Sequence, residues 1–146
     1  MSVQDTVEGI LDALENGDFA EVRTYLSSDF QFIGAAMGAL NRDEWLGLSA
    51  GLKAAFPDFS YNFIIEDING NEATVSVQMT GTHTEDWDLS AMGIGVVPAT
   101  GIAFSARRSD SVGIVENDLI VEISVDPSPD TGVPAIMQQL GIQPPG

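Results

Sequence analysis

Apolar residues recur at helical spacing over the first part of the chain. They are Val3, Val7, Ile10, Leu11 and Leu14. This spacing predicts an amphipathic helix over residues 4–16, which Gly17 ends. A second, shorter helix is predicted over residues 19–26, and a short strand over residues 29–33.

A third helix is predicted from its N-terminal cap. Asn41 is a good capping residue, and Glu44 follows three positions later as its partner in a capping box. Proline disfavours helical backbone in the residue before it, so Pro57 is expected to end the helix at about Phe56. The apolar side of this helix carries Trp45, Leu48, Leu52 and Phe56.

After Pro57 the apolar pattern changes to a period of two, which is typical of strands. The four predicted strands cover residues 59–68, 72–84, 102–114 and 119–125. Short turns at 69–71 and 116–118 separate two pairs of them. Residues 85–100 are expected to form a long loop, and residues 133–140 a terminal helical segment.

Helices followed by a meander of antiparallel strands indicate the α+β class, in a single domain over residues 1–146. So few strands cannot close into a barrel. The expected architecture is therefore a cone-shaped, curved antiparallel sheet. The N-terminal helices cover one of its faces and enclose a cavity.

The only histidine of the chain, His83, continues the apolar face of the second predicted strand. Counting back in steps of two from it gives Met79, Val77, Val75 and Ala73. The imidazole is therefore expected to face the interior. It is either a hydrogen-bonded core residue or a polar group that serves a cavity.

The formal net charge is −17, from 22 acidic and 5 basic residues. Nucleic acids and anionic membrane surfaces are excluded as partners, because phosphate groups need basic patches. Such an excess of acid with a single lysine would also suit a saline habitat. The chain has no cysteine, no recognisable secretory signal and no membrane-spanning run, so we expect a cytoplasmic protein.

Several short motifs occur in a characteristic order. They are Ala55-Phe56-Pro57-Asp58, Gly81-Thr82-His83-Thr84, Pro98-Ala99-Thr100-Gly101, Leu119-Ile120-Val121-Glu122 and Gln139-Leu140-Gly141. In this order and spacing, over residues 5–142, the chain resembles the SnoaL-like polyketide cyclases of the nuclear transport factor two-like superfamily. The resemblance implies an intramolecular aldol-type ring closure on an apolar, carbonyl-bearing small molecule, without metal or organic cofactor.

The resemblance also implies an acidic residue near the last strand that moves the proton, with an assisting histidine on the neighbouring strand. The position of that histidine falls on Asp110, and the position of the catalytic aspartate falls on Val125. Asp126 lies one residue further, and a bulge in the strand would bring it inward. A carboxyl group in an apolar pocket has a raised pKa and acts as both base and acid near neutrality.

The candidate catalytic residues are therefore Asp126, Asp110 and His83. The candidate substrate pocket is formed by Arg108, Phe104, Trp45, Met79 and Trp87. Arg108 and Asp110 share a strand face and could pair. Trp87 and Met92 form either a lid or part of the packed body. The acidic residues around Trp87 are expected to be solvated rather than to bind a metal.

Two other functions stay open at this point. The first is a non-catalytic module of the same fold that binds a small apolar ligand or only dimerises, and the absence of the family's assisting histidine favours it. The second is a related cavity enzyme, similar to an epoxide hydrolase or a ketosteroid isomerase. In each case the outer face of the open sheet is expected to pack against a second copy of the chain, which gives a homodimer.

Overall fold

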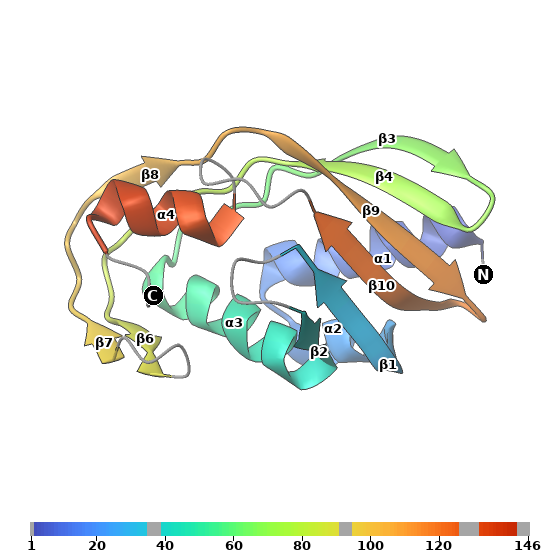
Figure 1. Cartoon of the computed structure of the whole chain (residues 1–146), viewed down its shortest axis with the longest axis horizontal. Helices are drawn as coiled ribbons and strands as arrows, with labels where there is room; N and C mark the ends of the chain where they lie inside the picture. Colours follow the sequence, from blue (N-terminus) through green and yellow to red (C-terminus); the bar gives the residue numbers. More distant parts are fainter. Residues whose placement is uncertain (1, 35–38, 91–94, 126–131, 143–146) are drawn as a thin grey trace.

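In the computed structural model, helices line one side of a curved sheet (Figure 1). The structure describes residues 2–34, 39–90, 95–125 and 132–142. Helices α1, α2 and α3 lie along one face of the sheet, and α4 lies beside β8, at the end away from the β3–β4 hairpin (Figure 1). The helices are α1 Val3–Asn16, α2 Phe19–Thr24, α3 Arg42–Ala55 and α4 Gly132–Leu140.

One sheet of six strands dominates the fold, in the order β2-β1-β10-β9-β4-β3. Only β1 and β10 run parallel, and the other neighbours are antiparallel. Its strands are β1 Leu26–Ile33, β2 Leu40–Asn41, β3 Ile64–Asn69, β4 Glu72–Val77, β9 Ser109–Glu116 and β10 Leu119–Val125. Two small antiparallel pairs complete the strands: β5 Thr80–Thr82 with β8 Ala103–Ser105, and β6 Trp87–Leu89 with β7 Gly95–Val97.

The predicted helix ends are confirmed by side-chain caps. The Asn41 side chain accepts a hydrogen bond from the Glu44 N–H at 2.8 Å, and the Glu44 carboxylate accepts one from the Asn41 N–H at 2.9 Å. Gly17 ends α1 in the left-handed conformation, with φ 72°. Each of these signals acts between residues no more than four positions apart in the chain, so the sequence alone predicted the helix ends well.

The predicted long strands are correct in position but are interrupted. The strand expected over residues 72–84 is divided into β4 and β5, and the strand expected over residues 102–114 is divided into β8 and β9. The segment between β4 and β5 stays next to the segment between β8 and β9, because the Ala106 N–H donates to the Met79 carbonyl at 2.9 Å. A period-two pattern continues through such a bend and does not reveal it.

The prediction of a loop over residues 85–100 was wrong in part, because β6 and β7 form a hairpin there. Trp87 and Leu89 are buried on the same side of β6, and each pairs with a residue of β7. The segment is rich in glycine and acidic residues, and this composition hid the short alternation of Trp87 and Leu89.

A bulge in β10 changes which residues face the core. The register shifts between Ile120 and Glu122, so that Ile120 lies opposite Val115 and both are buried. Val121 is only half-buried, and Ile120 takes the core position instead. On the opposite, outer face of the sheet, Ile64 is 51% exposed, and the homodimer stays a prediction.

Candidate functional site

His83 follows β5 directly and has no solvent-exposed surface. Its imidazole lies against the ring of Phe56, with 5.1 Å between the ring centroids, and near the ring of Trp87 at 6.5 Å. Phe104 contacts the same Phe56 ring edge-on at 5.1 Å. The predicted pocket residues Trp87 and Phe104 are thus brought together with His83 around one phenylalanine.

Thr100 holds one nitrogen of this imidazole. Its N–H donates to Nδ1 at 3.3 Å, and its hydroxyl lies 3.0 Å from the same nitrogen. The N–H of Ile102 donates to the Thr100 hydroxyl oxygen at 3.2 Å, which leaves the hydroxyl proton free to point at Nδ1. Nδ1 is therefore an acceptor, and the neutral imidazole carries its proton on Nε2.

The Nε2 nitrogen is buried and has no hydrogen-bond partner among the described residues. Burial lowers the pKa of His83 below its usual value, and the charge of the Asp86 carboxylate offsets part of that effect. A neutral imidazole at physiological pH fits both observations. A buried N–H donor without a partner costs about 1–3 kcal/mol, and a hydrogen-bond acceptor placed beside it would recover that cost.

The strand that carries His83 is fixed from the outside by Asp58. The Asp58 carboxylate accepts hydrogen bonds from the Thr82 N–H at 2.7 Å and from the Thr82 hydroxyl at 2.9 Å. The bond from the Thr82 backbone is the main reason why the pKa of Asp58 is lowered. Asp58 follows Pro57, so the end of α3 and the end of β5 are held together next to the imidazole.

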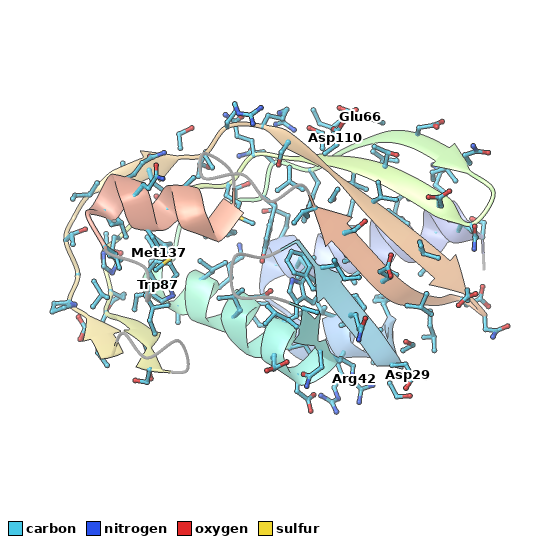
Figure 2. All side chains as sticks on the ribbon, viewed as in Figure 1. Asp29, Arg42, Glu66, Trp87, Asp110 and Met137 are labelled. Atoms are coloured by element: carbon cyan, nitrogen blue, oxygen red, sulfur yellow. The ribbon has the colours of Figure 1, made fainter. Side chains whose placement is uncertain are left out.

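The structure does not bring Asp110 and His83 together. Asp110 is exposed on β9, where it pairs with Ser76, and Ser76 lies seven positions before His83, on the other side of the break between β4 and β5. Figure 2 likewise shows Asp110 far from Trp87, which borders the imidazole. The side chain lies on the face of the sheet opposite Val75, and that face is not the core face.

Arg108 does not pair with Asp110 either. Its guanidinium donates to the Ser76 hydroxyl at 2.6 Å and to the Asn62 carbonyl at 3.0 Å. Arg108 therefore joins β4 to the segment that leads into β3. The expected Arg108–Asp110 pair is replaced by these two contacts.

The remaining candidates lie apart from His83 or outside the described residues. Trp45 is buried against Phe30 and Phe32, roughly 16 Å along α3 from Phe56. Met79 is half-buried and directly precedes β5, whereas His83 directly follows it. Asp126 and Met92 fall outside the described residues. Trp87 is 1% exposed, so it is part of the packed body.

A family model for the SnoaL-like domain matches residues 7–123, which is well over half of the chain. The chain belongs to the SnoaL-like family. It has the nuclear transport factor two-like fold that the resemblance implied. No curated protein matches the sequence of this SnoaL-like protein significantly.

Solved structures agree on the fold across low sequence identity. A candidate polyketide cyclase from Xanthomonas campestris is 12% identical, with a TM-score of 0.70 over 94% of this chain and 96% of that one. IdmH from Streptomyces antibioticus, also a candidate polyketide cyclase, is 24% identical, with a TM-score of 0.66 over 97% and 100%. AclR from Streptomyces galilaeus, a candidate hydroxylase, is 16% identical, with a TM-score of 0.69 over 97% of both chains. One fold thus carries proteins assigned to different reactions.

No helix among the described residues of this SnoaL-like protein is long and apolar enough to cross a membrane. No three or more histidine, cysteine, aspartate or glutamate side chains of residues 2–34, 39–90, 95–125 and 132–142 gather as a metal site would require.

Sequence reasoning missed the partners of His83. Thr100 was noticed only as part of a turn motif, although its side chain and its N–H both bind Nδ1. The Asp86 carboxylate lies near enough to raise the pKa of His83, and it accepts a hydrogen bond from the Ala99 N–H at 3.2 Å. Both Asp86, three positions after His83, and the turn motif that contains Thr100 were visible in the sequence. The sequence does not specify, however, which of these side chains reaches the imidazole ring.

The lowered pKa of His83 predicts how stability depends on pH in this SnoaL-like protein. The usual value is 6.5, and the folded value is lower, so the unfolded chain binds the extra proton first as the pH falls. The contribution of His83 is present in full above about pH 6.5 and is lost below it, by at most about 1.4 kcal/mol per pH unit. Urea unfolding of wild type and His83→Phe between pH 7.5 and 5 measures it. Parallel curves for the two proteins would contradict the assignment.

Proposed function

We propose that this SnoaL-like protein is a cofactor-free enzyme that acts on an apolar, carbonyl-bearing small molecule. It removes a proton from the carbon beside the carbonyl and closes a ring by intramolecular aldol addition. The observation that carries the proposal is the buried Nε2–H of His83, which has no partner among the described residues and belongs to a ring packed against aromatic side chains. Such a donor stabilises the negative oxygen that forms when the proton leaves.

The reaction needs one carboxylate and one neutral donor. The carboxylate takes the proton, and the resulting carbanion attacks a second carbonyl carbon of the same molecule. A carbon–carbon bond forms, the π bond of that carbonyl breaks, and its oxygen takes up a proton. Asp126 is the candidate for the carboxylate, from its place after β10. Asp110 pairs with Ser76 on β9 and is exposed, so it is given no role in this step.

Deuterium exchange tests the proton abstraction without knowledge of the natural substrate. Alpha-tetralone is an apolar aromatic ketone with exchangeable hydrogens beside its carbonyl. Incubated with the protein in deuterated buffer, it is expected to gain deuterium at that carbon faster than the buffer alone allows, with a rate that saturates as the ketone concentration rises. Mass spectrometry measures the uptake. If the ketone binds but no catalysed exchange is seen, the proposed enzymatic activity is contradicted.

A second function is a binding module without catalysis, and one observation favours it. Among the described residues, no carboxylate forms a hydrogen bond with the Nε2 nitrogen. The same donor would then hold the carbonyl oxygen of a ligand without any proton transfer. This function predicts saturable binding of alpha-tetralone, seen as a shift of the His83 resonances, together with exchange at the background rate.

A further inference from the structure

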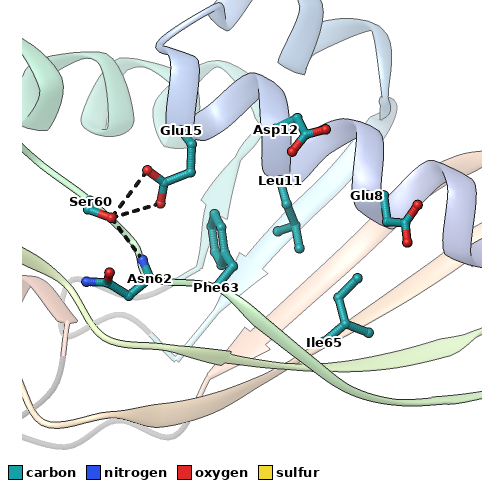
Figure 3. A pocket seen from close by; sticks show the side chains of 8 residues that line it. All are labelled: Glu8, Leu11, Asp12, Glu15, Ser60, Asn62, Phe63 and Ile65. Atoms are coloured by element: carbon teal, nitrogen blue, oxygen red, sulfur yellow. Dashed lines mark hydrogen bonds between the residues drawn. The ribbon is translucent and has the colours of Figure 1, made fainter.

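A groove of about 590 Å³ lies between α1 and the segment that leads into β3 (Figure 3). Its apolar part is made by Leu11 on α1 and by Phe63 and Ile65 on the opposite side, whose side chains point toward the helix (Figure 3). A volume in this range is common for sites that bind small molecules. The groove is separate from His83, so its role does not depend on the proposed reaction.

Three carboxylates of α1 border the groove: Glu8, Asp12 and Glu15. Glu15 is already engaged, since its carboxylate accepts hydrogen bonds from the Tyr61 N–H at 2.6 Å and from the Ser60 hydroxyl at 3.3 Å. The Lys53 ammonium also lies at this end, where it donates to the Glu15 carbonyl at 2.8 Å. The carboxylate and the carbonyl of Glu15, at this end of the groove, therefore already have hydrogen-bond donors.

The other end of the groove has charge without a counter-charge. Glu8 and Asp12 are both exposed, and neither forms an ion pair within the described part of the chain. They lie four residues apart on one helix face, where like charges repel each other and destabilise the helix. A cation placed between them would remove that repulsion and gain two favourable contacts.

We propose that this groove binds a small amphipathic organic cation. Its apolar body would lie against Leu11, Phe63 and Ile65, and its ammonium group would lie between the carboxylates of Glu8 and Asp12. The lining stretch of α1 runs over eight residues, or roughly 10 Å, which suits a molecule of two or three rings. A second copy of this acidic chain and an anionic ligand are both repelled from the same place.

Naphthylmethylamine, which is protonated at neutral pH, is a suitable probe. Naphthylmethanol and naphthylacetate are its neutral and anionic counterparts. The amine is expected to bind in the millimolar range, in the order amine, alcohol, acetate, and to shift the amide resonances of residues 8–15 and 63–65 in a two-dimensional NMR titration. The preference of the amine over the alcohol should shrink in molar salt, because the carboxylates are exposed.

The variant Glu8→Gln/Asp12→Asn tests the charges directly. It is expected to weaken amine binding roughly three- to tenfold and to leave alcohol binding unchanged. The matched control Glu72→Gln/Glu116→Gln removes two exposed carboxylates elsewhere and should leave both unchanged. Equal affinity for amine and alcohol would overturn the proposal, as would a control variant that loses as much affinity as the groove variant, or resonance shifts outside the groove.

Discussion

Replacing His83 with phenylalanine is expected to lower the catalysed deuterium exchange into alpha-tetralone by about 10²- to 10³-fold, which is the usual effect of removing one donor to an oxyanion. The substitution removes Nε2–H, while an aromatic ring remains against Phe56 and Trp87. The loss should appear in the maximal rate more than in the concentration at half saturation, because the donor acts mainly on the charged intermediate.

Two further variants separate this role from a purely structural one. His83→Gln places an amide N–H near the position of Nε2 and is expected to recover part of the rate. Asp110→Asn alters an exposed carboxylate remote from the imidazole and is expected to leave the rate unchanged. If His83→Phe keeps the wild-type rate, or if Asp110→Asn loses as much as His83→Phe, the assignment of His83 as the donor is wrong.

The largest effect on stability is expected at Phe56. Its side chain is fully buried, and its ring contacts the rings of His83, Trp87, Phe104 and Phe59. Phe56→Ala leaves a cavity in the middle of this cluster and should cost about 3–5 kcal/mol in the free energy of unfolding. For a chain of this length, that corresponds to a fall in Tm of roughly 10 °C or more.

Phe63→Ala is the matched control for this prediction. Phe63 is half-buried at the rim of the groove and stacks on Tyr61 at 4.8 Å. Its loss removes less buried surface, so the expected cost is less than half as large. Thermal unfolding followed by circular dichroism measures both variants. Equal losses for Phe56→Ala and Phe63→Ala would show that the cluster around Phe56 is not the centre of the core.

Much of the fold follows from local signals in the sequence. The capping box at Asn41 and the stop at Gly17 predict helix ends, and Asn69-Gly70-Asn71 predicts the β3–β4 hairpin, because each signal acts between residues close in the chain. The interruption of the long strands and the bulge near Ile120 were not predictable in this way. They depend on how strands from distant parts of the chain bend against one another.

In the candidate site, too, the features set by local pattern were predictable, and the contacts between distant parts of the chain were not. The burial of His83 follows from the period of two that places it on the apolar face. Its partner Thr100 is 17 residues away and reaches it only because Ile102 pairs with the backbone of His83. Asp110 shares its face with Ser76 rather than with Val75, a distinction that depends on the register between β4 and β9. Register of this kind cannot be read from one strand alone.

The protonation of the His83 imidazole decides whether this residue is a neutral donor, and the chain offers a clean measurement because this is its only histidine. Protein labelled with ¹⁵N in histidine gives the two ring nitrogens of a single imidazole. At pH 7 we expect a neutral ring with the proton on Nε2, and a further shift of the Nε2 resonance when alpha-tetralone is added. A proton on Nδ1, or a fully protonated ring at that pH, would contradict the claim that His83 offers a neutral donor to a ligand oxygen.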